Sequence, residues 1–143
     1  MELLKLTVAV PVLAGHLILF PGALPARAGD AAKTPPASVR HVDVATAARL
    51  ITTNAVVILD VRTGKEFAQG HIAGATNIDA LAGDFAEKAA QLDRGRTYLV
   101  HCATGKRSTN CLPQLQRLGC TNLIHLDGGF RAWQAAGKPV AKK

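Results

Sequence analysis

The sequence predicts an α/β domain built around a mostly parallel sheet. Short apolar runs rich in β-branched residues alternate along the chain with segments whose apolar residues recur at helical spacing. Three of these runs are typical of buried parallel strands, namely residues 55–61, 97–102 and 121–127. Strands that alternate with helices form such sheets, and the ligands of these sheets bind at the carboxyl ends of the strands.

The other expected elements follow one another without an internal repeat. Asp43 is placed to cap the first helix, and Gly119 to end the fourth. Pro113 is expected near the start of that fourth helix, where proline is tolerated. Residues 71–78 are expected to form a loop that leads into a further short strand. The expected edge strand and helices are, in order, residues 39–42, 44–51, 63–70, 80–92, 108–119 and 128–137.

The first 28 residues have the pattern of a secretory signal peptide. A run of about 15 apolar residues follows Lys5, and Ala26 and Ala28 occupy the small positions of an A-x-A cleavage motif. Spanning a bilayer takes roughly 20 residues, so cleavage after Ala28 is favoured over an uncleaved membrane anchor. The chain would then be periplasmic or secreted, without stable membrane insertion. Residues 29–38 are expected to form a flexible lead-in, and residues 39–143 are expected to form the domain.

Charge and composition argue against a nucleic-acid partner. The chain has 17 basic and 10 acidic residues, a formal net charge of +7, and 4% aromatic residues. A nucleic-acid groove needs a basic stripe with stacking rings, whereas the cations here are scattered. The positive field is instead suited to collecting small anions.

The three cysteines, Cys102, Cys111 and Cys120, are an odd number for an exported chain, so at least one thiol is unpaired. A helix between Cys111 and Cys120 would hold them roughly 13 Å apart, beyond the disulfide limit of about 7 Å. Both are therefore expected to be buried thiols. The sequence contains no Cys-x-x-Cys pair and no His/Cys cluster at zinc-ligand spacing, so no metal or organic cofactor is expected.

The segment HCATGKRS, which places Cys102 at the end of an apolar strand, has the composition of an anion-binding loop. Gly105 can adopt backbone angles that turn successive amides inward, and Lys106 and Arg107 add positive charge. Ser108 can cap the following helix, whose N-terminal amides would face the loop. Such surroundings lower the pKa of a thiol from about 8.5. Cys102 is therefore expected to be a reactive thiolate rather than a small buried hydrophobe.

Three stretches together resemble a single rhodanese domain and cover nearly the whole of residues 39–137. They are LDVRTGKEFAQGHIAGATNI, HCATGKRS and LDGGFRAW. The resemblance implies a rhodanese-like α/β fold with helices on both faces of the sheet. It also implies a thiosulfate sulfurtransferase, in which Cys102 takes a sulfane sulfur as a persulfide and passes it to cyanide or a thiol.

The resemblance further implies that the backbone after Cys102 cradles the outer sulfur and the sulfonate of the donor. Lys106 and Arg107 would attract and orient that anion. The substrate-binding positions implied in this way are Ala103, Thr104, Gly105, Lys106, Arg107 and Ser108.

Residues outside the loop are expected to have supporting roles. Asp60 and Arg62 match a family segment near the pocket, and an ion pair between Arg62 and Glu66 is expected to brace the loop. His101 is expected to point away from the side of the strand that carries the nucleophile. His71 is expected to be a hydrogen-bonded loop histidine rather than a base.

Two other functions fit part of the pattern. Phosphatases and arsenate reductases of the same fold have a loop one residue longer, with arginine at the sixth position after the cysteine, whereas Arg107 is the fifth here. A non-catalytic rhodanese-like module would carry sulfur or bind a partner but turn over poorly with small acceptors. The expected partners are a small anionic sulfur donor, a cyanide or thiol acceptor, and a thiol-redox protein.

Overall fold

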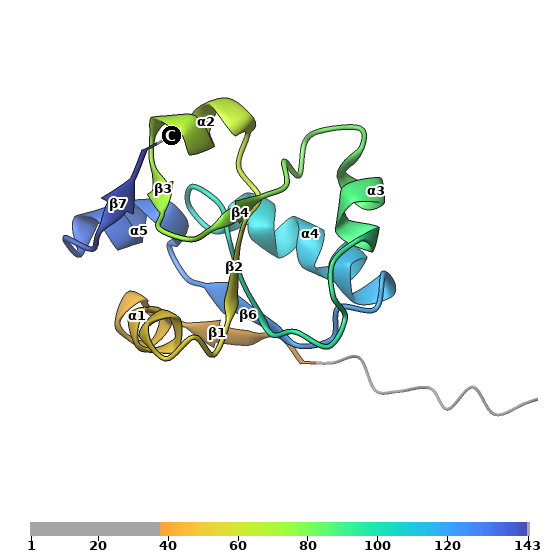
Figure 1. Ribbon diagram of the computed structural model, residues 1–143, viewed down its shortest axis with the longest axis horizontal. Helices are drawn as coiled ribbons and strands as arrows, with labels where there is room; N and C mark the ends of the chain where they lie inside the picture. The colour runs from red at the N-terminus through yellow and green to blue at the C-terminus, as the bar shows by residue number, and fades with distance from the viewer. Residues whose placement is uncertain (1–37, 143) are drawn as a thin grey trace, which may run out of the picture. The chain divides into compact units, whose positions relative to one another are not determined.

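The computed structural model describes residues 38–142 as an α/β fold (Figure 1). The expected signal peptide and all but the last residue of the expected lead-in lie outside this range. Among the described residues, no helix combines the length and the apolar character needed to cross a bilayer.

The central sheet has five strands, all paired in parallel, as predicted. They are β1 (Arg40–Val42), β2 (Val57–Asp60), β4 (Thr76–Asn77), β5 (Tyr98–His101) and β6 (Leu123–Leu126). Their order in the sheet is β1-β6-β5-β2-β4, so β1 is an edge strand as expected. A separate antiparallel pair joins β3 (His71–Ile72) to β7 (Val140–Ala141).

Within residues 38–142, five helices connect the strands, and local sequence explains how the first two begin. They are α1 (Val44–Thr52), α2 (Gly64–Gln69), α3 (Phe85–Ala90), α4 (Lys106–Arg117) and α5 (Gly129–Ala135). Asp43 caps α1 by accepting the Thr46 N–H at 2.8 Å. Thr63 and Glu66 cap α2 reciprocally, each side chain accepting the backbone N–H of the other.

Two of the helices differ from the prediction. The expected helix over residues 80–92 forms only at its centre, because residues around Gly83 make successive turns before α3 begins. The fourth helix begins at Lys106, so Ser108 lies inside its first turn and does not cap it. Pro113 lies in the interior of α4 rather than near its start.

The helices cover both faces of the sheet, as predicted. Side chains of α3 and α4 pack on one face, where they meet Leu59, Tyr98 and Val100. Side chains of α1 and α5, including Trp133, pack on the other face against strand residues such as Leu99. Successive residues of a strand alternate between the faces, so the even-numbered residues of β5 face α4. Cys102 continues that alternation and belongs to the α4 face.

Candidate active site

Cys102 lies directly after β5, at the carboxyl edge of the sheet, and is 1% exposed. Two donors reach its Sγ atom: the backbone N–H of Gly105 at 3.2 Å and the hydroxyl of Ser108 at 3.5 Å. Gly105 is also the N-cap of the 12-residue helix α4. The unpaired amides and positive dipole end of this helix therefore lie beside the thiol.

The hydrogen bonds lower the pKa of the Cys102 thiol. Burial alone acts to raise this pKa because it disfavours the thiolate. The Ser108 hydroxyl and the backbone N–H groups of Ser108, Thr104 and Gly105 act against burial and outweigh it. The loop therefore favours the charged, nucleophilic form of sulfur.

Glycine is required at two positions around this loop. Gly105 has a φ of +96°, which turns the chain abruptly from the strand into α4. At Gly129, φ is +59°, and a Cβ would lie 2.5 Å from the carbonyl oxygen of Cys102. The close approach lets the Phe130 N–H donate to the Cys102 carbonyl at 2.8 Å and the Arg131 N–H donate to the Ala103 carbonyl at 3.0 Å. These bonds hold the loop against the start of α5.

The two loop cations have different surroundings. Lys106 is exposed on the first turn of α4. Arg107 donates from both terminal nitrogens to the carboxylate of Glu66, at 2.7 and 2.6 Å. The hydrogen bond from Arg107 is the main reason why the pKa of Glu66 falls to about 2. The predicted ion pair between Arg62 and Glu66 is therefore wrong, because Arg107 takes the Glu66 carboxylate.

Arg62 instead bonds Asp60, and both side chains are buried. The Nη2 atom donates to the Asp60 carboxylate at 2.6 Å and to the Gly70 carbonyl at 2.7 Å. Its guanidinium also lies 4.0 Å from the centre of the Phe130 ring. Arg62 thus ties the end of β2 to the end of α2 and to α5.

The structure confirms the predicted direction of His101 and the hydrogen bond of His71, but His71 lies in the short strand β3 rather than in a loop. His101 is fully buried on the α5 side of the sheet, with its ring 6.3 Å from that of Phe130. Burial lowers the pKa of His101. The Nδ1 atom of His71 is 2.9 Å from the Phe67 carbonyl oxygen, and the two rings stack.

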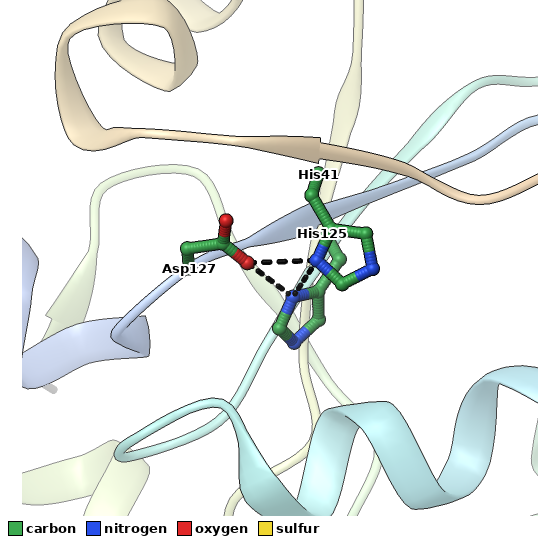
Figure 2. A group of neighbouring side chains, drawn as sticks. All are labelled: His41, His125 and Asp127. Carbon is green, nitrogen blue, oxygen red and sulfur yellow. Dashed lines mark hydrogen bonds and ion pairs between the residues drawn. The ribbon is translucent and has the colours of Figure 1, made fainter.

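Sequence analysis did not identify a role for two further histidines, His41 and His125. The Nε2 atom of His125 is 2.8 Å from Ser108 Oγ, and its Nδ1 atom is 3.0 Å from Asp127 Oδ1. A row of contacts therefore runs from Cys102 through Ser108 and His125 to Asp127. His41 joins the far end, as Figure 2 shows. The spacing of His125 and Asp127 along a predicted strand places them on one face, but only the fold brings Ser108 and His41 to them.

A cavity of about 250 Å³ adjoins the loop at Ala103. Arg62 and Glu66 line one part of it and Arg131 another. Arg131 is exposed and adds a cation that sequence reasoning missed. A larger cavity of about 710 Å³ is lined by α2 and the segment from β3 to β4, with no residue of the cysteine loop in its wall.

Comparison with known proteins identifies the family. Residues 43–136 match the family described as the rhodanese-like domain. The chain belongs to the rhodanese family. The match includes β2, the cysteine loop and all of α5, so the cysteine site lies within the matched residues, whereas His41 lies just before them.

Similar proteins have this domain in chains of different lengths. Thiosulfate sulfurtransferase GlpE of Shewanella oneidensis is 34% identical over 69% of this chain and 96% of its own length. An uncharacterized Synechocystis protein, slr1261, is 37% identical over 62% of this chain but only 49% of its own length. The chain thus spans nearly all of one relative and about half of another.

Solved structures support the same fold. The crystal structure of a rhodanese-related protein from Thermoplasma volcanium is 34% identical, with a TM-score of 0.66. The alignment covers 73% of this chain and 99% of that one.

Proposed function

We propose that this rhodanese domain is a sulfurtransferase that moves a sulfane sulfur through a persulfide on Cys102. The observation that carries the proposal is the set of donors around Sγ, which lowers the pKa of a thiol that is 1% exposed. The name of the Shewanella relative, a thiosulfate sulfurtransferase, supports thiosulfate as the first donor to test.

The reaction proceeds in two displacements at sulfur. The Cys102 thiolate attacks the outer sulfur of thiosulfate, the sulfur–sulfur bond of the donor breaks, and sulfite leaves with the bonding electron pair. Cyanide or a thiolate then attacks the outer sulfur of the persulfide. The new bond gives thiocyanate or an acceptor persulfide, and the Cys102 thiolate is regenerated.

The loop supports both displacements by hydrogen bonding. The outer sulfur of the persulfide carries negative charge, which amides at the start of α4 can stabilise as they stabilise the resting thiolate. Lys106 and Arg131 are exposed cations near the loop and its adjoining cavity, and they attract the anionic donor. Asp60 and Arg62 act by holding β2, α2 and α5 in place.

The position of Arg107 favours sulfur transfer over phosphate hydrolysis. A phosphatase needs a guanidinium that is available for the oxygens of phosphate. Both terminal nitrogens of Arg107 donate to the Glu66 carboxylate. Arg107 is therefore proposed to brace the loop rather than to bind the donor.

Intact-protein mass spectrometry tests the proposal. The full chain is incubated with thiosulfate and then with cyanide, beside the variants Cys102→Ser and Cys111→Ser. The proposal expects the wild type and Cys111→Ser to gain one sulfur atom and to lose it to cyanide, while Cys102→Ser gains none. Equal gain in Cys102→Ser would overturn it. A persulfide that forms but resists cyanide and thiols would favour the sulfur-carrier alternative.

A further inference from the structure

Three potential metal ligands meet at the edge of the sheet, beside the proposed sulfur site. His41 in β1 lies directly opposite His125 in β6, because the two are partners in the parallel register. Asp127 follows two residues after His125 and points to the same side. Figure 2 shows the three side chains converging on one another. Their nearest atoms are His41 Nδ1, His125 Nδ1 and Asp127 Oδ1.

Hydrogen bonding can join both histidines to Asp127, but it leaves the two histidine nitrogens close together without a bond between them. The separations are 2.8 Å from His41 Nδ1 to Asp127 Oδ1, 3.0 Å from His125 Nδ1 to Asp127 Oδ1, and 3.3 Å between the two nitrogens. If both nitrogens are protonated, two donors face each other. If only one is protonated, the other nitrogen and the carboxylate face each other as acceptors. When both nitrogens donate to Oδ1, the 3.3 Å approach between them is a close contact of two donors and not a hydrogen bond.

The other ring nitrogen of His125 also argues for a lone pair at Nδ1. His125 Nε2 lies 3.2 Å from the carbonyl oxygen of Gly105 and 2.8 Å from Ser108 Oγ. A carbonyl oxygen only accepts, so Nε2 matches this surrounding when it carries the proton. A neutral imidazole protonated at Nε2 has its lone pair on Nδ1, toward His41 and Asp127. Metal-ligating histidines commonly donate their second N–H to a backbone carbonyl in this way.

We propose that His41 Nδ1, His125 Nδ1 and Asp127 Oδ1 bind a zinc ion. A cation between them would accept a lone pair from each of the three atoms and would replace the close approach of the two nitrogens with two metal–ligand bonds. Ligands about 2.0–2.1 Å from a tetrahedral zinc stand roughly 3.3 Å apart, so small movements of these side chains complete the site. Two imidazoles with one carboxylate suit zinc better than magnesium or calcium, which prefer oxygen ligands.

Two of the three side chains are exposed, which suits an ion that enters from solvent. The side chains of His41 and Asp127 are 52% and 56% exposed, whereas that of His125 is 4% exposed. Two ligands can therefore adjust around an ion that the third holds in a fixed position. The exposed side leaves a fourth coordination position for water or another ligand. Sequence spacing hides this site because its two histidines lie 84 residues apart.

Zinc titration by calorimetry tests the site directly. The tag-free full chain is titrated after chelation, in a Cys102→Ser background so that the active thiol does not compete for zinc. We expect one zinc per chain, and binding at least about tenfold weaker in His41→Gln and in Asp127→Asn. The matched control, His71→Gln, should bind zinc like its parent. Circular dichroism checks that the variants fold. We expect them to fold because the side chains at positions 41 and 127 are more than half exposed.

Imidazole nitrogen spectra provide a second readout that does not depend on affinity. In ¹⁵N-labelled protein, zinc should shift Nδ1 of both His41 and His125 to ligated values while His125 Nε2 keeps its proton. The proposal is overturned if no saturable binding occurs, if the His41 and Asp127 variants bind like their parent, or if zinc shifts Nε2 instead. None of these results needs a sulfur donor, so failure here leaves the proposed transferase activity untouched.

Discussion

Cys102 and Cys111 are two buried thiols on the same face of the sheet, and their chemistry is opposite. They are 1% and 6% exposed. The pKa of Cys102 is lowered, whereas burial and the nearby Cys102 charge raise the pKa of Cys111 to about 12. Amides and a hydroxyl donate to Cys102 Sγ, but Cys111 Sγ itself donates to the Ser108 carbonyl at 3.2 Å.

The contrast shows that burial does not decide whether a thiol reacts. The start of α4 presents N–H groups, which stabilise a thiolate, whereas its interior presents carbonyl oxygens, which stabilise a neutral thiol. Ser108 contacts both cysteines, with its hydroxyl toward Cys102 and its carbonyl toward Cys111. The direction of the backbone therefore separates the proposed nucleophile from a packing residue nine positions away.

Replacing Cys102 or Cys111 with alanine should give the largest difference in activity between two variants. Cys102→Ala is expected to lower the rate of thiocyanate formation from thiosulfate and cyanide by roughly 10³-fold or more, because the covalent intermediate is lost. Cys111→Ala should keep most of the rate and lose some stability from its cavity. Steady-state assays on both variants check this. Comparable losses in the two variants would remove the distinction between the thiols.

The substitution Gly129→Ala should break the contact that holds the cysteine loop against α5. The new Cβ would meet the Cys102 carbonyl oxygen at 2.5 Å at a φ of +59°, and we expect a loss of about 2 kcal/mol in the free energy of unfolding. Gly137→Ala is the matched control, because its φ is +64° and nothing lies within 4 Å of the new Cβ. Urea unfolding compares them. Equal losses would show that backbone strain alone, and not the loop contact, matters.

Removing the Ser108 hydroxyl should make Cys102 more like Cys111. Ser108→Ala deletes a side-chain donor to Sγ, so the pKa of Cys102 should rise, and its alkylation at neutral pH should slow by about tenfold. The control is Thr109→Ala. Thr109 donates to the Gly105 carbonyl without a bond to Sγ. Alkylation rates at pH 7 decide the matter, and equal slowing by both changes would argue against a direct effect of Ser108.

The smallest effect is expected for the exposed cation of the loop. Lys106→Ala should raise the KM for thiosulfate about two- to fivefold with little change in kcat, because a single exposed charge contributes weakly. Lys142→Ala changes the net charge equally at an exposed position after β7 and should leave KM unchanged. Initial-rate kinetics at low salt measure both. An equal rise in KM for Lys142→Ala would indicate a general field rather than a loop contact.

Sequence periodicity predicted most of the fold because strand and helix patterns are local. Parallel pairing, the edge position of β1 and the capping by Asp43 were all recoverable in this way. The helices on both faces followed from the resemblance to the rhodanese family. The start of α4 was predicted two residues late, because the left-handed Gly105 ends the loop immediately before Lys106. That difference places Ser108 inside the helix, where its hydroxyl reaches Sγ.

Contacts between distant segments were the part that sequence could not supply. Arg107 bonds Glu66 across 41 residues, which no local pattern indicates, and the prediction assigned Glu66 to the nearer Arg62. His41 and His125 carried no signal separately, since only the pairing of β1 with β6 brings them together. The position of Cys102 was predictable because strand, cysteine and glycine are adjacent in sequence.

The most direct test of the account is the pH dependence of alkylation at each cysteine, measured by peptide mass spectrometry with iodoacetamide. Only the thiolate reacts, so a lowered pKa moves the rise in rate to lower pH. The account predicts that the Cys102 profile has its midpoint below that of free cysteine, about 8.5, while Cys111 stays unreactive at that pH. A Cys102 midpoint at or above the value for free cysteine would contradict the claim that the loop stabilises its thiolate.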